Sequence, residues 1–374
     1  MDRCDVLIVG GGPAGSACAW KLRESGLDVV VMDKAIFPRD KVCAGWITPQ
    51  AIDDLQIDAD EYRHARVFQP ITGFRVGLIG GDEEVETTYD RPVSFGIRRC
   101  EFDDYLLRRS GARLVLGAPI SSIRRDGAQW VVNETVKASM LVGAGGHLCP
   151  VARMLNGPTD HAPLIAAQEV EFAIDPRAAS SFTVAAERPE LYFCRDLRGY
   201  GWFIRKQDYL NIGFGRLGAH AVPRASAEFV DFLKARHKIP AEASWRWHGH
   251  AYLLSAPPRR RPVGDGVMLV GDAAGLAYPQ SGEGIRPAIE SGLIAASTMI
   301  EANGRYTRDR LEPYEHHLQR RFGIGPLARL LSRAVPVGIP AALALRLLER
   351  PWFVRHVLLN RWFLHAQEPA LALS

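Results

Sequence analysis

Three glycines near the start of the chain, Gly10, Gly12 and Gly15, have the spacing that brings a backbone close to phosphate groups. Gly10 permits a tight turn, Gly12 lets a phosphate approach, and Gly15 lets the next helix pack closely on the preceding strand. That helix begins at Pro13 and Ala14, and its first N–H groups and positive dipole end point to the same place. These residues therefore predict a site for the pyrophosphate of a dinucleotide.

The elements around these glycines are those that such a site needs. Residues 5–9 form a short apolar run that is typical of a buried parallel strand, and a helix is expected over about 13–24. A second buried strand, 28–32, ends at Asp33, which is placed to accept hydrogen bonds from ribose hydroxyls, with Lys34 directly after it. The order of strand, helix, strand and acid favours a dinucleotide site over an ordinary glycine-rich turn.

A second glycine-rich segment, residues 271–284, lies far along the chain and indicates which dinucleotide is bound. It reads Gly-Asp-Ala-Ala-Gly-Leu-Ala-Tyr-Pro-Gln-Ser-Gly-Glu-Gly and follows an expected buried strand over 267–270. A nicotinamide dehydrogenase needs only the first segment. An extended FAD also needs an acid for its ribityl chain and backbone amides beside its ring. The two segments together therefore predict FAD.

Composition limits the other classes of function. With 374 residues, 47% of them hydrophobic, the chain can bury a sizeable core in two domains or one large domain. Its six cysteines are scattered without C-x-x-C spacing, and the pair His316-His317 has no third ligand at metal spacing, so no metal site is expected. No signal peptide precedes the first strand, so a reducing cytoplasm is expected. No nucleic-acid partner is expected either.

The C-terminal region is unusually basic. From Arg320 onward it holds eight arginines and only two acidic residues, among many apolar ones. Its longest uncharged run, 334–345, is too short to span a bilayer. Two interpretations stay open. The region either lies on the inner face of an anionic membrane as a peripheral helical surface, or forms helices that cap the substrate pocket.

The remaining pattern indicates an α/β fold with an inserted sheet. Strand-like alternation dominates 70–95 and 164–254, a small meander is expected over 113–143, and helices are expected over 101–109 and 225–237. We therefore expect a Rossmann-type FAD-binding domain, an antiparallel β-sheet domain for the substrate, and a helical C-terminal region. Their expected segments are, in that order, 1–70 with 96–155 and 262–300; 71–95 with 156–261; and 301–374.

Four motifs resemble the group of FAD-dependent enzymes that joins aromatic hydroxylases, flavin halogenases and geranylgeranyl reductases. Two are the glycine-rich segments above, a third is 141–146 followed by Arg153, and the fourth is 99–106, similar to R-x-x-F-D-x-x-L. The resemblance implies that Arg99 reaches the cofactor and that an acid binds its ribityl or pyrophosphate region. In the last segment, the implied cofactor contacts are Gly271, Asp272, Pro279, Gly282, Gly284 and Ile285.

Two further segments resemble the geranylgeranyl reductase branch of this group. Residues 37–45 are similar to F-P-R-x-K-x-C-G-G, and residues 200–204 are similar to the lipid-contact motif Y-x-W-x-F-P. The resemblance implies substrate contacts from Tyr200, Trp202 and Phe203. The chain departs from the pattern at Ala44, at the missing proline, and at Gly145, which stands where relatives have an aspartate near the nicotinamide. A halogenase is disfavoured, because its W-x-W-x-I-P segment is not present.

The chemistry implied by the resemblance is flavin redox on a hydrophobic or lipid substrate. Cys43 is placed beside the flavin, where its thiol would donate a proton to an alkene carbon; the other interpretation is a packed cysteine in the wall. No second G-x-G-x-x-G follows a buried strand, so electrons are expected from transiently docked NAD(P)H or an external reductase. The roles of His147, Tyr278 and Glu283 are left open.

Three functions follow, in order of preference. The first is reduction of carbon–carbon double bonds in a prenyl-type or similar lipid. The second is an NAD(P)H- and oxygen-dependent monooxygenase that hydroxylates an aromatic or apolar substrate. The third belongs to another class, a non-catalytic FAD-binding module for electron transfer.

Overall fold

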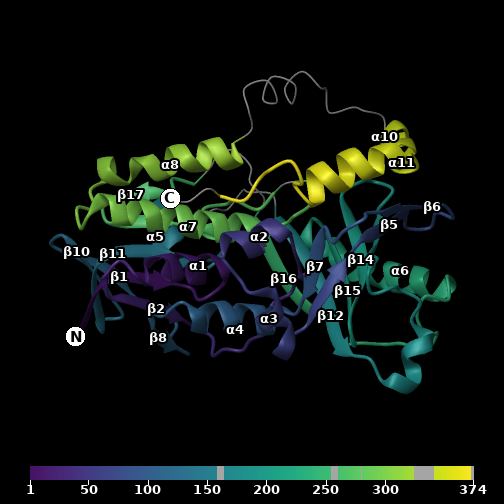
Figure 1. The fold of residues 1–374 in the computed structure, drawn as a ribbon, viewed down its shortest axis with the longest axis horizontal. Helices are drawn as coiled ribbons and strands as arrows, with labels where there is room; N and C mark the ends of the chain where they lie inside the picture. Colours follow the sequence, from purple (N-terminus) through teal and green to yellow (C-terminus); the bar gives the residue numbers. More distant parts are fainter. Residues whose placement is uncertain (158–163, 254–259, 279, 324–340, 372–374) are drawn as a thin grey trace.

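The computed structural model describes residues 1–157, 164–253, 260–278, 280–323 and 341–371. An eight-stranded, largely parallel sheet with its helices forms one end of the molecule, and a mostly antiparallel sheet of seven, generally longer strands forms the other (Figure 1). The second sheet is called the larger sheet below because its strands hold more residues. The C-terminal helices lie over the larger sheet in the same view. The predicted fold class, a Rossmann-type sheet combined with an antiparallel sheet and C-terminal helices, is confirmed.

The parallel sheet is built from segments far apart in the sequence. Strand β1 pairs in parallel with β2 on one side and with β11 on the other, and β18 continues the sheet beyond β11. Its strand order is β17 (Val263–Gly264), β18 (Val267–Leu269), β11 (Val136–Gly143), β1 (Asp2–Val9), β2 (Val29–Asp33) and β8 (Arg113–Leu116). This brings the ends of β1, β2, β11 and β18, and so all the glycine-rich segments, to one edge.

The meander predicted over 113–143 is only partly correct. Strands β9 (Ile123–Asp126) and β10 (Gln129–Val132) do form a hairpin that continues antiparallel into β11. Strand β8 instead pairs in parallel with β2 at the far edge of the sheet. Arg113 holds it there through ion pairs with Asp2 and Asp28, contacts that a local strand pattern does not reveal.

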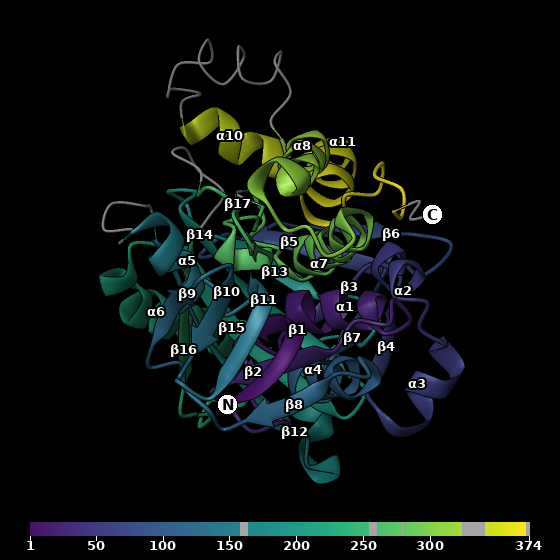
Figure 2. The same cartoon turned by 90° about the vertical axis from the view of Figure 1, so that its left-hand side faces the viewer.

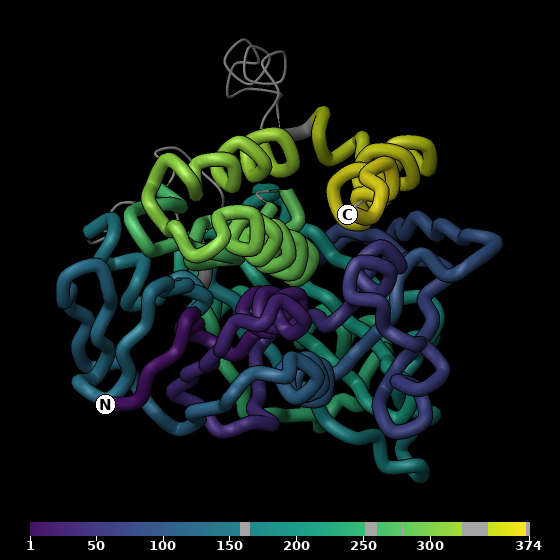
Figure 3. The backbone as a smooth tube through the Cα atoms, turned by 60° about the vertical axis from the view of Figure 1, so that its left-hand side comes forward, coloured from purple at the N-terminus to yellow at the C-terminus, as the bar shows by residue number. Residues whose placement is uncertain are grey.

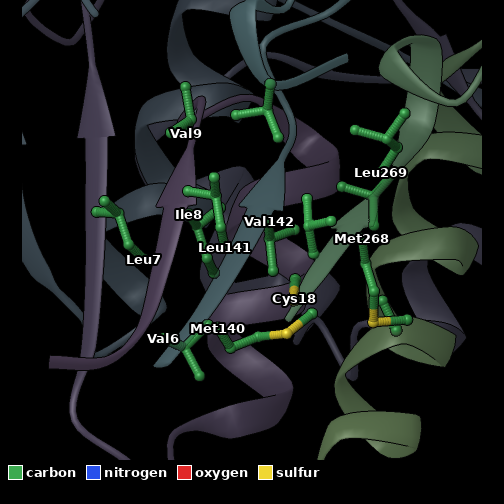
Figure 4. Packing of buried hydrophobic residues seen from close by; sticks show 14 of the residues in the cluster. Val6, Leu7, Ile8, Val9, Cys18, Met140, Leu141, Val142, Met268 and Leu269 are labelled. Atoms are coloured by element: carbon green, nitrogen blue, oxygen red, sulfur yellow. The ribbon is translucent and has the colours of Figure 1, made fainter. Parts of the chain in front are cut away.

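The core of this end lies between the parallel sheet and its helices. Figure 4 shows Val6 and Ile8 of β1 packed with Val142, Met268 and the Cys18 thiol. Cys18 belongs to helix α1 and is fully buried, so it behaves as a small apolar residue.

Helix α1 (Pro13–Leu22) ends earlier than the sequence pattern suggested. The Ser25 hydroxyl donates to the carbonyl of Leu22 and thereby closes the last turn. Gly26, with a φ of +77°, follows in the turn to β2.

Helices α7 and α8 cover this end of the molecule. Helix α1 packs against α7 and α4, and Figure 3 shows the two green helices α7 and α8 above the purple N-terminal segment. Figure 2 shows the same layering from the side, with α4 and β8 below. The helices here are α2 (Pro49–Asp54), α3 (Ala59–Ala65), α4 (Arg99–Arg109), α5 (Pro150–Asn156), α7 (Ile285–Ala302) and α8 (Arg308–Phe322).

The larger sheet has two buried faces. One face packs on helix α6 (Val222–Ala235), and the other faces the C-terminal helices and the parallel sheet. Its strand order is β16 (His248–Leu253), β12 (Leu164–Ala173), β15 (Tyr209–Leu217), β14 (Gly199–Lys206), β13 (Glu190–Phe193), β5 (Gly73–Leu78) and β6 (Glu84–Thr88). A small sheet of β3 (Trp46–Ile47), β7 (Ser94–Ile97) and β4 (Phe68–Ile71) completes the strands described.

The C-terminal region packs on the larger sheet as α10 (Ala341–Leu348), α11 (Pro351–Phe353) and the π-helix η4 (Val354–Phe363). Phe363 is 1% exposed, so it belongs to the core and cannot contact a membrane. Residues 334–340 of the uncharged run 334–345 lie outside the residues that the structure describes. Among the described residues, no helix is both long and apolar enough to cross a bilayer.

Candidate active site

A cavity of about 650 Å³ lies where the carboxyl ends of β1 and β2 meet the larger sheet. This is the edge at which open α/β sheets bind their ligands, and the volume is in the usual range for a ligand site. The residues predicted from the sequence that line it are Gly10, Gly12, Pro13, Ala14, Asp33, Lys34, Cys43, Arg99, Tyr200, Trp202, Asp272, Gly282, Gly284 and Ile285. The fold thus brings candidate cofactor and substrate contacts into one cavity.

Two predicted glycines lie behind the cavity wall. A Cβ atom at Gly15 would collide with the carbonyl of Gly10, so Gly15 permits the close approach of helix and turn that its spacing predicted. Gly271 has a φ of +58°, and a Cβ atom there would lie 3.0 Å from the Cβ of Ala14 and 3.3 Å from that of Ala288. Pro279 lies outside the described residues.

Phe203 does not line the cavity, although it was predicted to contact substrate. It is fully buried on the opposite face of the larger sheet, in the cluster that packs on α6. Successive side chains of a strand point to opposite faces, so Tyr200 and Trp202 cannot share a face with Phe203. The Tyr200 hydroxyl donates to the carbonyl of Ser281, which also lines the cavity.

The turn at Gly12 fits a pyrophosphate. A Cβ atom there would have one neighbour within 4 Å, the Nη2 atom of Arg39 at 3.5 Å, so the position is open to the cavity. Arg39 forms an ion pair with Asp103 through Nη2, at 3.1 Å. Its Nη1 atom is buried without a hydrogen-bond partner among the described residues. A phosphate oxygen would satisfy that nitrogen and lie at the N-terminus of α1.

Sequence reasoning did not assign Arg39 to the cofactor. It lies in the segment 37–45 that resembles reductases, and there it was noted only as part of the pattern. Asp33, by contrast, is where the pattern placed it. Its carboxylate accepts from the N–H groups of Gly11 at 2.7 Å and Ala35 at 2.8 Å, which fixes it at the end of β2 beside the cavity.

A cluster of charges occupies the middle of the cavity. Arg99 is bidentate to Asp103, at 2.8 Å for both contacts, and although its burial opposes the charge, Asp103 raises the pKa of the guanidinium. Burial lowers the pKa of Lys41 to about 8, with Arg99 adding repulsion. Burial raises the pKa of Asp272, against the attraction of Lys41 and Arg99. The cluster suits an anionic, hydrogen-bonding ligand such as the ribityl and phosphate part of FAD.

The Cys43 thiol faces this cluster. It accepts a hydrogen bond from the N–H group of Gly45 at 3.4 Å, and it lies near enough to Arg99 to favour the charged guanidinium. The Gly45 donor leaves the S–H bond free to point elsewhere, and the residue lines the cavity. Cys43 is therefore placed to give a proton to a ligand held between the glycine-rich turns and Trp202.

The structure places the three residues that the sequence left open. His147 lines the cavity with its ring 5.3 Å from that of His250, and burial lowers the His147 pKa to about 4. Glu283 also lines the cavity, and burial raises its pKa to about 7. Tyr278 instead stacks on His365 at 3.7 Å and donates to Glu368, so it contacts the C-terminal segment. His316 and His317 are exposed on α8, as expected of a solvated pair.

Glu169 is a buried acid next to the Cys43 segment that the sequence pattern did not single out. It lies on β12 at 8% exposure, and burial raises its pKa from 4.5 to about 7. The folded protein therefore holds this proton more tightly than the unfolded chain does. The resulting stabilisation is fully present below pH 4.5 and is lost as the pH rises through about 7.

We expect Glu169→Gln to flatten the pH dependence of stability. Between pH 4.5 and pH 8 the parent protein should lose about 3 kcal/mol of unfolding free energy more than the variant, from a pKa difference worth about 1.4 kcal/mol per unit. Denaturant unfolding of both proteins across this range measures the difference. Glu283 and Asp54, whose pKa values burial also raises, are present in both proteins and cancel. Parallel profiles would contradict the assignment.

Comparisons with known proteins agree with the geometry of this site. A family described as FAD dependent oxidoreductase matches residues 5–75. The menaquinone reductase of Mycobacterium tuberculosis is 31% identical over 366 residues, covering 88% of this chain and 84% of that protein. The geranylgeranyl diphosphate reductase of Rhodobacter capsulatus is 29% identical over 327 residues, covering 79% and 75%. A geranylgeranyl bacteriochlorophyll reductase-like crystal structure from Thermoplasma acidophilum has a TM-score of 0.72 at 20% identity, covering 95% and 98%.

Fold, cavity and relatives together define an FAD-dependent oxidoreductase. The chain belongs to the family of the menaquinone reductase of Mycobacterium tuberculosis, and it is also similar to geranylgeranyl reductases. The predicted family resemblance, the predicted cofactor FAD and the predicted enzyme class are thereby confirmed.

Proposed function

We propose that this protein reduces carbon–carbon double bonds in the prenyl chain of a lipid. The observation that carries the proposal is the shared cavity, in which Cys43 and Trp202 lie beside the glycine-rich turns of the FAD site. The names of the relatives support it, because menaquinone and geranylgeranyl diphosphate both carry an unsaturated polyprenyl chain.

The residues have separate roles in this proposal. Gly12, Arg39 and Asp272 would hold the cofactor, and reduced FAD bound there would be the source of a hydride for one alkene carbon. Cys43 gives its proton to the other alkene carbon, so that the double bond gains two hydrogen atoms and the thiolate takes a proton back from solvent. Tyr200 and Trp202 present aromatic surface to the apolar chain.

The aromatic wall continues into the C-terminal region. The Phe363 ring packs edge-on against Tyr200 at 5.4 Å and tilted against Trp46 at 6.1 Å. The helices that the sequence left as either a cap or a membrane surface thus support the proposed substrate wall on their inner side. We propose NAD(P)H as the electron donor, docking transiently at the same cavity. The second G-x-G-x-x-G spacing in the chain, residues 213–218, offers no separate dinucleotide site, because Gly213 and Gly215 pair within the antiparallel strand β15 instead of forming a turn between strand and helix.

Product analysis tests the proposed reaction. The FAD-loaded protein is incubated with NADPH and with menaquinone or geranylgeranyl diphosphate, under air and without oxygen. After any quinol formed from menaquinone has been reoxidised, mass spectrometry should show a gain of two hydrogen atoms per reduced double bond in both atmospheres. A gain of one oxygen atom that needs air would show a monooxygenase instead. Reduced FAD without any product from either lipid would point to an electron-transfer module.

The outer side of the C-terminal region fits a peripheral membrane contact, which we propose as the route to a lipid substrate. Trp352 is 67% exposed and Leu343 is 50% exposed. The four arginines of these helices, Arg346, Arg350, Arg355 and Arg361, are all exposed. Exposed tryptophan among arginines is a pattern that binds anionic lipid surfaces.

Neutralising these arginines should weaken membrane binding. Each basic residue near an anionic surface contributes about 1 kcal/mol to the binding free energy. Changing all four arginines to glutamine should therefore reduce vesicle affinity by about 10²–10³-fold. Co-sedimentation with vesicles containing phosphatidylserine measures the change at low and high salt. A matched control changes four exposed arginines elsewhere, namely Arg63, Arg108, Arg124 and Arg224. Salt-independent binding, or no binding by the parent protein, would leave these helices as a cap alone.

A further inference from the structure

The segment 37–45, which carries Cys43, is hydrogen-bonded through the backbone of Cys43 to side chains of the larger sheet. The backbone N–H group of Cys43 donates to Oε2 of Glu169 on β12 at 2.7 Å. The backbone carbonyl of the same residue accepts from Nδ2 of Asn211 on β15 at 3.3 Å. Both partners are buried, Asn211 at 1% exposure. Each polar backbone atom of Cys43 is thus paired with a side chain of the larger sheet.

Asn211 also fixes the residue proposed to contact the lipid. Its Oδ1 atom accepts from the indole Nε1 of Trp202 at 2.6 Å, while its amide nitrogen lies 3.3 Å from Glu169 and 3.2 Å from Glu171. One buried amide therefore joins the Cys43 segment to the indole of Trp202. Any shift of the segment relative to the sheet would break at least one of these contacts.

Gly45, two residues after Cys43, lies against the ion pair of Lys206 and Glu171. Lys206 is fully buried, and its Nζ atom lies 2.7 Å from Oε1 of Glu171. Although burial opposes it, the attraction of Lys206 lowers the pKa of Glu171. Gly45, with a φ of +68°, lies directly against this ammonium and the carbonyl of Ile97, where a Cβ atom would collide with both. Only glycine fits this approach, so the segment is held at Gly45 as well as at Cys43.

We propose that Glu169 and Asn211 are positioning residues, a buried clamp that holds Cys43 and Trp202 in fixed relation across the cavity. The clamp itself rests on the contacts above, whereas its catalytic consequence rests on the proposed alkene reduction. The groups facing Glu169 are Lys206, Glu171 and Asn211 from the sheet and the Cys43 backbone. Losing Glu169 would leave a buried N–H group of Cys43 without its partner, so the segment would open to pair with water.

Alkylation of the Cys43 thiol tests the clamp without any turnover. The FAD-loaded protein is treated with iodoacetamide, and the modification rate of the Cys43 peptide is followed by mass spectrometry. Glu169→Ala should raise this rate about tenfold, as expected from loss of one charge-assisted hydrogen bond, and Glu169→Gln, which keeps an acceptor, should raise it less. Glu169→Gln also serves alone if the alanine variant does not fold.

Two controls separate the clamp from general loosening. Cys194 is a half-buried thiol directly after β13 of the same sheet, and its alkylation rate should not change in any variant. Glu190→Gln removes a buried carboxylate of that sheet, one paired with Arg75 and Lys238, and should leave the Cys43 rate unchanged. Equal Cys43 rates in the parent and both Glu169 variants would overturn the proposal, as would a parallel rise at Cys194.

Turnover then separates the clamp from the proposed function. If the protein reduces prenyl chains, Glu169→Gln should lower kcat more than it raises KM, with FAD content unchanged. If the parent reduces no prenyl lipid but Cys43 alkylation still responds to Glu169, the clamp stands and the proposed reaction fails. If alkylation does not respond, the clamp is wrong whatever the reaction.

Discussion

Changing Cys43 to serine is expected to lower formation of the reduced lipid by about 10²–10⁴-fold, the usual contribution of a general acid. The thiol faces the cavity between Arg99 and Gly45, and a hydroxyl in its place is a much weaker acid. FAD content and reduction of the bound cofactor should stay unchanged, because neither needs the thiol. Steady-state product formation and flavin absorbance on the same preparations measure the two properties separately.

The matched control for this variant is Cys194→Ser, at a half-buried cysteine outside the cavity, which should keep full activity. Undiminished product formation by Cys43→Ser would contradict the role of the thiol. The donor would then be sought at Lys41, whose ammonium shares the cavity and whose pKa burial lowers to about 8.

Gly12→Val is expected to yield protein largely free of FAD. A Cβ atom at this position enters the space beside Arg39 in which the pyrophosphate is proposed to lie. Crowding of this kind typically costs 1–3 kcal/mol, so FAD affinity should fall by about 10–10²-fold. Flavin absorbance per protein and titration of the apoprotein with FAD measure the loss.

Gly249→Val is a suitable control for the effect of a glycine-to-valine change outside the cavity. Gly249 is exposed on β16, and an added Cβ atom there has open space around it. It should retain FAD. If Gly12→Val binds FAD as tightly as the parent protein does, the phosphate assignment at the first turn is wrong.

The residues that bind backbone or phosphate follow local rules, and the sequence predicts them well. Gly10, Gly12 and Asp33 occupy fixed places relative to β1, α1 and β2, and all three line the cavity. Phe203 shows where a motif misleads, because strand alternation sends neighbouring aromatic residues to opposite faces of the sheet. The motif alone does not show which of those faces is turned toward the cavity.

Residues whose role depends on distant segments were not predictable in the same way. Glu169 and Glu171 alternate along β12 as charged residues usually do on a solvent face. Only the packing of the Cys43 segment on that face buries Glu169 and leaves Glu171 no more than partly exposed. Likewise, Phe363 and Trp352 look alike in the basic C-terminal sequence, yet one is in the core and the other is exposed. Tertiary contacts alone distinguish them.

The most direct test of the central claim is anaerobic stopped-flow spectroscopy. The bound FAD is reduced without oxygen and mixed with a prenyl lipid that has no quinone ring, such as geranylgeranyl diphosphate, because a quinone would itself accept the two electrons. The flavin absorbance is followed before any oxygen is admitted. Proposed alkene reduction predicts that the oxidised flavin spectrum returns in the absence of oxygen, with reduced lipid formed in equal amount. A flavin that stays reduced with every prenyl lipid and is reoxidised only when oxygen enters would contradict the account.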